Sequence, residues 1–374
     1  MKKFFFLTPG CFDKGGISRY SRYQIDALRN VVGADKLWVA SLMGKTTDSF
    51  EESFDVDYSG TSNGKIQQIK FALFFIIKAI VHRPKVIHVA HINFSGLVVF
   101  IANLVGAKTV LNVYGLEIWS KLSRDATWGL KKVDYIISDC HNTKNYLVDN
   151  NIRRDEDITV IWDCVDIEKF KPASLDKLEQ LAIDYQLPAK SEKMAILTLG
   201  RVSYAAKHKG YNRLIHAYAQ LDTDKFYLVI AGKGDMVNEL KELTVDLNIS
   251  DSVYFAGMIH EEDMAAIYSY ADIFSLVSEA GDKKGEGIPL TPIEAMACGT
   301  PIIVGDEDGS REAIIDENGI CVASHDQKGY LEAVNTITSD VDTFSKKALE
   351  IATQVFSYTM FLEKHKTFYT ALKN

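Results

Sequence analysis

The chain has 374 residues, 47% of them hydrophobic and 25% charged, which excludes a disordered or collagen-like chain. At roughly 150 residues per domain, this length predicts two domains. The net charge of −8 is uneven, because residues 1–190 carry 25 Lys or Arg and 22 Asp or Glu, whereas residues 191–374 carry 17 and 28. An acidic chain with one mildly basic half argues against nucleic-acid binding and favours two domains with different surfaces.

Short β-branched or aromatic runs alternate with amphipathic stretches in the first half. Strands are predicted at residues 3–8, 37–42, 85–90, 109–114, 135–138 and 158–162. Helices are predicted at residues 17–32, 66–81, 95–105 and 143–150. This alternation indicates βαβ units and a parallel sheet covered on both faces.

The second half shows the same alternation of strands and helices. Strands are predicted at residues 194–200, 227–231, 253–256, 273–277 and 301–304, and helices at residues 211–221, 236–247, 261–270 and 292–298. A connector at residues 171–193, rich in Lys, Glu, Ala and Pro, places the boundary near Pro188 and gives domains 1–187 and 188–354. We expect an α/β protein of two Rossmann-like domains facing across a cleft, with ligands beyond the carboxyl ends of the strands.

The sequence favours a cytoplasmic location. Its five cysteines are widely spaced and form no CxxC pair, which is typical of reduced thiols and argues against a zinc site. The apolar stretch at residues 4–7 is too short for a secretion signal. The run at residues 71–81 is broken by Lys78 and is too short to span a bilayer.

A glycine-rich turn follows the first strand. Gly15 and Gly16 stand where the chain enters the next helix, and paired glycines there let backbone N–H groups approach a phosphate. An ordinary tight turn explains the same residues equally well. The motif is not GxGxxG, and no acidic residue follows a clear second strand, which disfavours a dehydrogenase.

Two cations follow the first strand of the second half. Gly200 and Arg201 stand at the end of this strand, and Lys209 stands just before the next helix. The pair suits a diphosphate, because Arg binds it bidentately and Lys acts as a point charge. The alternative is two solvated basic side chains.

Residues 278–299 give the sharpest signal, because they leave a strand, cross a Gly-rich loop and enter a helix. Thr291 is expected as the N-cap, Pro292 as the first helical residue and Glu294 as the third, a capping box. In one interpretation Glu294 only caps the helix and Glu286 is a solvated loop charge. In the other, the helix N-terminus stabilises a phosphate, Glu294 accepts ribose hydroxyls and Glu286 binds sugar hydroxyls.

Glu286 and Glu294 are separated by seven residues in EGIPLTPIEAMACGTPII, which resembles the E-x7-E signature of retaining glycosyltransferases of family 4, enzymes of the GT-B fold. The resemblance spans nearly the whole chain, with its motifs in the expected order. It includes GGISR at residues 15–19, the GR and KG pairs within 200–210, AGKG at 231–234, FAGMI at 255–259 and the run at 271–277. In GT-B proteins a terminal helix, here at residues 355–374, packs back on the first domain.

The resemblance implies a role for each matching residue. Arg201 and Lys209 neutralise the donor diphosphate, with Lys207 as a rival for the second position. Gly15 and Gly16 close over the diphosphate from the other domain. The remaining donor contacts are Gly200 beside the two cations, Glu294 on the ribose, Glu286 on the sugar, Ile259 at the base, and the amides of Leu290 and Thr291 on the phosphate.

The acceptor side departs from the family pattern. The family has a His near the anomeric centre, and a gap-free register puts Ala90 there, so His91 is the expected residue and His88 the alternative. The usual His-Gly-x-Glu and Asn-Gly-Val-Asp motifs stand here as YGLE at residues 114–117 and DCVD at residues 163–166.

The implied function is retaining transfer of a sugar from a nucleotide-diphosphate sugar to a hydroxyl of a glycan or lipid-linked acceptor, in bacterial surface polysaccharide synthesis. Arg201, Lys209, Glu286 and His91 form the expected catalytic set. No metal and no cofactor are expected, because the two cations stabilise the leaving diphosphate. A sugar-nucleotide 2-epimerase and a non-catalytic nucleotide-sugar-binding subunit stay open as alternatives.

Residues 65–85 combine basic side chains with the apolar run at residues 71–77. The basic or histidine residues are Lys65, Lys70, Lys78, His82, Arg83 and Lys85. A buried helix with basic ends explains this pattern, and so does an interfacial helix on anionic lipid at the inner face of the cell membrane. The second interpretation predicts peripheral membrane contact and a lipid-linked acceptor.

Overall fold

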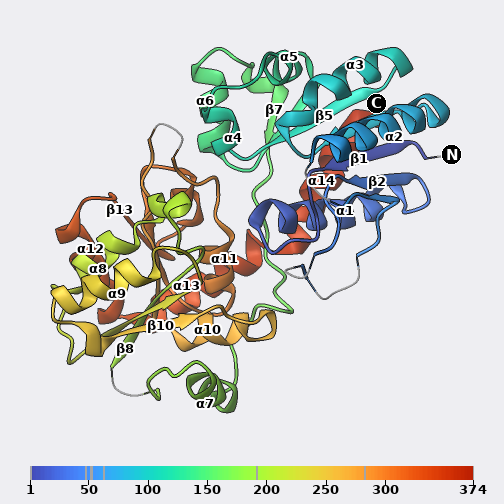
Figure 1. The fold of residues 1–374 in the computed structure, drawn as a ribbon. Coiled ribbons are helices and arrows are strands. Elements are labelled where there is room, and N and C mark those ends of the chain that lie inside the picture. The colour runs from blue at the N-terminus through green and yellow to red at the C-terminus, as the bar shows by residue number, and fades with distance from the viewer. Residues whose placement is uncertain are drawn as a thin grey trace. The chain divides into compact units, whose positions relative to one another are not determined.

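The computed structural model describes residues 2–46, 49–50, 54–61, 64–190, 193–281 and 284–373. The chain divides into two compact units, one of Met1–Cys164 with Thr359–Asn374 and one of Val165–Tyr358 (Figure 1). Each unit is a parallel sheet with helices on both faces, so the predicted pair of Rossmann-like α/β domains is confirmed. None of the helices in the described ranges is both long enough and apolar enough to cross a bilayer.

The first unit contains a seven-stranded parallel sheet in the order β3-β2-β1-β4-β5-β6-β7. Its strands are β1 (Phe4–Thr8), β2 (Leu37–Ser41), β3 (Tyr58–Ser59), β4 (Val86–Val89), β5 (Lys108–Val113), β6 (Tyr135–Ser138) and β7 (Ile158–Val160). All five residues of β1 are buried, because helices cover both faces of a parallel sheet and leave no strand position for solvent.

The helices of the first unit divide between these two faces. They are α1 (Gly16–Val32), α2 (Lys65–His82), α3 (Ser95–Val105), α4 (Leu116–Trp119), α5 (Arg124–Lys132), α6 (His141–Asp149) and α14 (Tyr358–Lys373), with 3-10 turns η1 (Ile92–Phe94) and η2 (Asp155–Asp157). Phe71 of α2, Val98 of α3 and Leu130 of α5 pack with Phe5 and Ile87 of the sheet in one core.

On the other face, α14 packs in the first unit through a buried polar network. His88 Nε2 lies 2.6 Å from Asn112 Oδ1, and its Nδ1 contacts the Tyr369 hydroxyl of α14. Gln24 of α1 lies 3.1 Å from His365 Nε2. Burial lowers the pKa of His88 to about 3, so this histidine is neutral and held on both ring nitrogens.

The second unit contains a six-stranded parallel sheet in the order β10-β9-β8-β11-β12-β13. Its strands are β8 (Met194–Leu199), β9 (Phe226–Ala231), β10 (Val253–Gly257), β11 (Ile273–Leu276), β12 (Ile302–Gly305) and β13 (Gly319–Val322). Its helices are α7 (Leu175–Asp184), α8 (Tyr211–Tyr218), α9 (Val237–Asp246), α10 (Met264–Tyr270), α11 (Leu290–Ala297), α12 (Gln327–Ser339) and α13 (Val341–Gln354). The 3-10 turns are η3 (Tyr204–Lys209), η4 (Ser250–Ser252), η5 (Glu261–Asp263) and η6 (Gly309–Ala313).

The division falls between Cys164 and Val165, earlier than the predicted boundary at residue 188. The segment expected to be a connector contains α7, which packs on the second unit. Lys177 Nζ lies 2.6 Å from Asp263 Oδ1, and the Tyr185 hydroxyl donates to Asp263 Oδ2 at 2.8 Å. These contacts make residues 165–187 part of the second unit.

Candidate functional site

The helix that carries Glu294 begins earlier than its sequence predicts. α11 starts at Leu290, Pro289 is its N-cap with extended backbone, and no side chain caps it. The predicted capping box of Thr291 and Glu294 is therefore wrong. Pro292 sits in the first turn, where a missing N–H costs no intrahelical hydrogen bond, so the helix runs through it.

Glu294 is thus the fifth helical residue and lies in the interior of the second unit. Only 2% of its surface is exposed. The Tyr268 hydroxyl of α10 donates a 2.8 Å hydrogen bond to its Oε2. This bond fixes the rotamer of the carboxylate just beneath the helix N-terminus.

Glu286 stands at the centre of a charged cluster in the loop before α11. Its Oε1 lies 2.7 Å from Lys209 Nζ and 2.8 Å from His208 Nε2. Burial alone would raise the pKa of Glu286, but the charge and hydrogen bonds of Lys209 and His208 lower it to about 2. The side chain is therefore a carboxylate at neutral pH, and both basic partners are oriented by it.

Hydrogen bonds to residues at the ends of two strands also hold the backbone of the loop at Glu286. The Glu286 N–H donates to Asp308 Oδ2 at 2.8 Å, and the same oxygen accepts the Ser278 hydroxyl at 2.7 Å. Ser278 follows β11 and Asp308 follows β12, so the carboxyl ends of two neighbouring strands support Glu286. This is the edge of the sheet at which the sequence predicts a ligand.

Gly200 brings the end of β8 against Lys209. A Cβ built at Gly200 would lie 2.8 Å from the Tyr211 hydroxyl oxygen and 3.6 Å from Lys209 Cδ. Arg201, the next residue, is exposed, and within the described chain no hydrogen bond joins it to the Glu286 cluster. Lys207 is also exposed, whereas Lys209 is half-buried and contacts Glu286.

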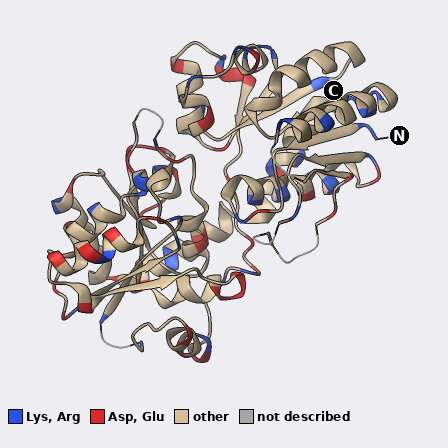
Figure 2. Ribbon diagram, viewed as in Figure 1, with Lys and Arg blue, Asp and Glu red and all other residues tan. Residues whose placement is uncertain are grey.

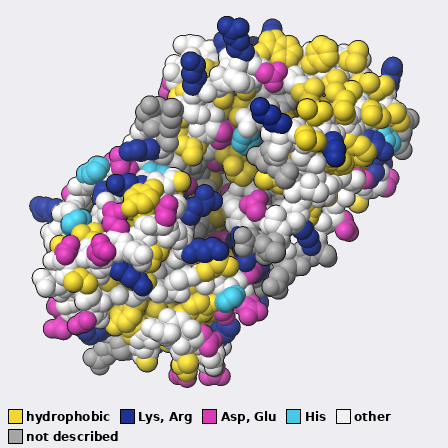
Figure 3. Space-filling model, in the orientation of Figure 1, with side chains coloured by type: hydrophobic (Ala, Val, Ile, Leu, Met, Phe, Trp, Pro, Cys, Tyr) yellow, Lys and Arg dark blue, Asp and Glu magenta, His cyan; other side chains and the backbone are white. Residues whose placement is uncertain are grey.

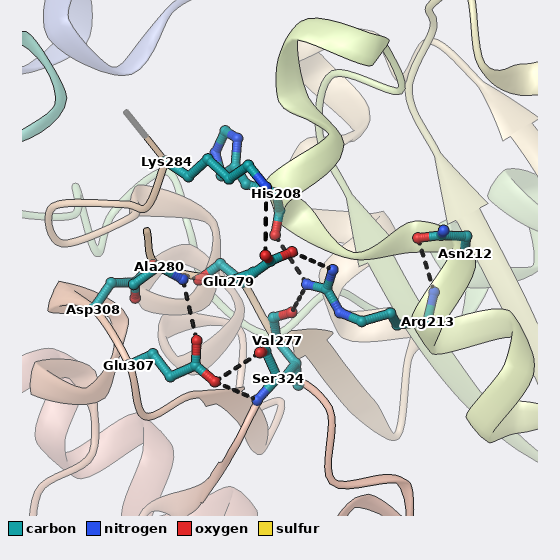
Figure 4. Close-up of polar contacts among 11 residues, drawn as sticks. His208, Asn212, Arg213, Val277, Glu279, Ala280, Lys284, Glu307, Asp308 and Ser324 are labelled. Atoms are coloured by element: carbon teal, nitrogen blue, oxygen red, sulfur yellow. Dashed lines mark hydrogen bonds and ion pairs between the residues drawn. The ribbon is translucent and has the colours of Figure 1, made fainter. Parts of the chain in front are cut away.

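A second ion-pair network, which the sequence analysis did not identify, positions the His208–Lys209 turn. Arg213 Nη1 of α8 pairs with Glu279 Oε2 at 3.0 Å, and its Nη2 donates to the backbone oxygens of His208 at 3.1 Å and Val277 at 3.2 Å (Figure 4). The Glu279 N–H donates to the same His208 oxygen at 2.8 Å. Arg213 therefore ties the turn before α8 to the end of β11. Only its i+4 spacing from Lys209 could have suggested this role.

The remaining donor-side residues lie at the same edge of the sheet. Ile259 follows β10, is 9% exposed, and comes two residues after Gly257, whose φ of +69° favours glycine. Leu290 is half-buried at the start of α11, and the Thr291 hydroxyl is buried without a hydrogen bond in the described chain. α11 thus presents its first amides beside a hydroxyl that has no hydrogen-bond partner among the described residues.

In the first unit, Gly15 and Gly16 begin α1. Gly15 has a φ of −74°, and its N–H donates to Asp13 Oδ1 at 2.8 Å. Gly16 is not among the positive-φ glycines, and a Cβ built on it would have no atom within 4 Å in the described chain. Backbone conformation therefore does not require glycine at residue 16, which faces open space.

The structure separates the two histidine candidates. His88 is 1% exposed and belongs to the buried network beneath α14. His91 is half-buried, and its Nδ1 accepts the Asn93 N–H at 3.3 Å where it caps η1. Burial lowers the pKa of His91 below its ordinary value. Ala90, the residue in the gap-free register, is buried.

Glu117 of the YGLE motif has a raised pKa. Its Oε1 accepts the Tyr114 N–H at 2.6 Å. Burial raises the pKa of Glu117 to about 7, against the lowering effect of these backbone hydrogen bonds. The side chain therefore titrates near neutral pH.

Two Rossmann-like units in one chain are the architecture of the GT-B fold. Residues 180–353 match the family model described as glycosyl transferases group 1. This match lies within the second unit, and the resemblance to GT-B glycosyltransferases of family 4 is confirmed.

The curated relatives share part of the chain. An uncharacterized glycosyltransferase of Methanocaldococcus jannaschii is 31% identical over 214 residues, which cover 54% of this chain and 50% of that protein. The alpha-monoglucosyldiacylglycerol synthase of Streptococcus pneumoniae is 27% identical over 278 residues, 72% of this chain and 58% of that protein. The match thus spans about half the length of these relatives.

The fold extends over the whole chain in a solved structure. HepE of Anabaena, crystallised in complex with UDP-glucose, is similar with a TM-score of 0.79 at 18% identity. The similarity covers 98% of this chain and 99% of that protein. At this identity the likeness establishes the fold.

Proposed function

We propose that the protein is a retaining glycosyltransferase that transfers a sugar from a nucleotide-diphosphate sugar to a hydroxyl of a glycan or lipid-linked acceptor. The observation that carries this proposal is the Lys209–Glu286 pair, 2.7 Å apart beneath the start of α11. The UDP-glucose complex of HepE and the group 1 family domain support a nucleotide-sugar donor. The name of the pneumococcal relative, a monoglucosyldiacylglycerol synthase, supports a lipid acceptor.

The donor diphosphate binds between the cations and the helix. Arg201 and Lys209 neutralise its charge, and the free amides at the start of α11 add a positive partial charge. Charge grows on the diphosphate as the glycosidic bond breaks, so these groups stabilise the transition state without a metal. Glu294 holds the ribose and Ile259 faces the base.

Glu286 exchanges partners when the donor binds. In the described structure its carboxylate is occupied by Lys209 and His208. The diphosphate attracts Lys209, and the carboxylate then accepts hydrogen bonds from the sugar hydroxyls. His208 keeps Glu286 oriented during this exchange.

The acceptor hydroxyl attacks from the side of the departing diphosphate, which retains the anomeric configuration. His91 of the first unit contributes at the anomeric centre, and Gly16 lets the backbone approach the diphosphate. Exclusion of water by this approach protects the donor from hydrolysis. We place the enzyme in the cytoplasm, at the inner face of the cell membrane, in surface polysaccharide synthesis.

The turnover of Arg201→Ala tests this proposal. Loss of a group that stabilises the leaving charge lowers turnover by about 100-fold or more. Lys207→Ala is the matched control, because it removes an exposed cation from the same loop, and it should keep turnover within about twofold of the wild type. Sugar transfer is measured as release of nucleoside diphosphate with a lipid extract or a glycan as acceptor. Equal turnover in the wild type and Arg201→Ala would remove Arg201 from the mechanism.

A further inference from the structure

The outer faces of α2 and α3 are apolar. Large hydrophobic side chains on this surface are 47 to 73% exposed. They are Ile66, Ile69, Leu73, Ile77, Ile80 and Val81 of α2 and Phe100 and Leu104 of α3, which we call the α2–α3 face. Their spacing of three and four residues puts them along one side of each helix.

The other side of α2 is already packed. Phe71, Phe75 and Ala79 are buried against the sheet. The interpretation of residues 65–85 as a buried helix therefore holds for one side of α2 only, because its other side is apolar and exposed. The aromatic residues of the run at 71–77, which suggested an interfacial helix, point mainly inward, and the aliphatic residues point outward.

Hydrophobic side chains gather over the part of the first unit where Figure 1 places α2 and α3, with basic side chains between them (Figure 3). A soluble monomer rarely exposes a contiguous apolar patch of this kind without a partner. The surface thus marks a place of contact.

The charged residues of the chain segment that forms the α2–α3 face have one sign. Residues 58–116 contain no Asp or Glu, and the ribbons of α2 and α3 carry blue and tan without red (Figure 2). The same stretch contains Lys65, Lys70, Lys78, Arg83, Lys85 and Lys108. All of these except the half-buried Lys78 are exposed, and Lys78 Nζ lies 5.3 Å from the Phe74 ring centroid.

The basic charge of the α2–α3 face distinguishes between its two possible partners, a second copy of the chain and a membrane. A second copy using the same face would bring basic residues against basic residues, because a twofold interface is self-complementary. An anionic bilayer supplies both an apolar boundary for the aliphatic side chains and phosphates for the lysines and arginine.

We propose that the α2–α3 face docks the protein on an anionic membrane. The apolar side chains enter the boundary between headgroups and acyl chains, and the basic residues contact lipid phosphates. This inference deepens the proposed membrane contact and rests on it, but it does not depend on which donor or acceptor is used.

Co-sedimentation with vesicles tests the inference. The full chain should pellet with phosphatidylcholine vesicles that contain 30% phosphatidylglycerol, and at least tenfold less with pure phosphatidylcholine. The double variant Leu73→Ser with Ile77→Ser should lose at least tenfold in partitioning to the anionic vesicles. The matched control is Leu175→Ser with Ile183→Ser, which removes two side chains of α7 that are 72 and 71% exposed. This control should pellet like the wild type.

Three outcomes would overturn the inference. The first is a wild-type protein that stays in the supernatant with anionic vesicles, and the second is a face variant that pellets as well as the wild type. The third is sedimentation velocity in which the wild type is a dimer and the face variant a monomer, which assigns the face to a second copy. Circular dichroism and thermal unfolding confirm that each variant is folded. Sugar-nucleotide binding, measured separately, tests the proposed function. Vesicle binding without donor binding would therefore contradict the proposed function and leave the membrane inference standing.

Discussion

Replacement of Glu286 by Gln should have different effects on binding of the nucleoside diphosphate and on binding of the sugar. The variant keeps the shape of the side chain and removes the charge that pairs with Lys209 at 2.7 Å and with His208 at 2.8 Å. In the free protein this pair must open before Lys209 reaches a diphosphate. Without it, nucleoside diphosphate should bind as tightly as in the wild type or up to about tenfold more tightly, because Lys209 is free.

The contribution of the sugar to binding affinity should fall in Glu286→Gln. A hydrogen bond to a charged group is worth about 1.5 kcal/mol more than its replacement by water, which is about tenfold in affinity. The ratio of the dissociation constants of sugar nucleotide and nucleoside diphosphate should therefore rise about tenfold or more in Glu286→Gln. The low pKa of Glu286, about 2, means that the wild-type carboxylate is charged throughout the assay range.

Isothermal titration with a sugar nucleotide and its nucleoside diphosphate measures this ratio. Glu242→Gln, on the exposed face of α9, is the control for loss of one acidic charge and should leave both constants unchanged. If both ligands weaken equally in Glu286→Gln, the carboxylate acts only by positioning Lys209, and the assigned contact with the sugar is refuted.

Further predictions concern stability. Gly200→Ala should lower the free energy of unfolding by about 1–3 kcal/mol, because its Cβ would lie 2.8 Å from the hydroxyl oxygen of the buried Tyr211. Gly16→Ala should not destabilise the fold, because the space around the new methyl group is open. Equal denaturation midpoints of Gly200→Ala and the wild type would contradict this. The raised pKa of Glu117, about 7, makes the wild type lose stability as pH rises from about 4.5 through 7, by up to about 3 kcal/mol. Urea titrations across this range should show Glu117→Gln without this loss, and parallel pH profiles would remove Glu117 as its source.

Much of the fold could be predicted from the sequence, because buried parallel strands are continuous apolar runs. The strand at 135–138 was predicted at its observed bounds, and β1, β8 and β9 lie within one residue of theirs. Weak signals explain the elements that were missed. β3 has two residues, and β13 has four beginning with glycine. α7 resembled a linker because its composition is polar, although Leu178 and Leu181 line its buried side.

The site was predictable where charge and spacing define it. The sequence placed Glu286 near Lys209 through motifs 77 residues apart in the chain, and the structure brings these two side chains into contact. It did not predict the start of α11, because prolines stand on both sides of Leu290 and Thr291 and the first one, Pro289, supplies the N-cap backbone. His208 and Arg213 were missed for another reason, because their roles depend on backbone oxygens and loop geometry that no residue pattern records.

The central claim is that the carboxyl edge of the second sheet binds a nucleotide-diphosphate sugar through Lys209. Thermal unfolding with a panel of UDP-, GDP- and ADP-sugars measures this most directly, since a ligand at 100 times its dissociation constant stabilises by about 2.7 kcal/mol. Sugar nucleotides of one base should stabilise the wild type, and Lys209→Ala should lose most of this shift. The central claim would be contradicted if no sugar nucleotide shifted the transition at millimolar concentration, or if Lys209→Ala bound the same donor as tightly as the wild type.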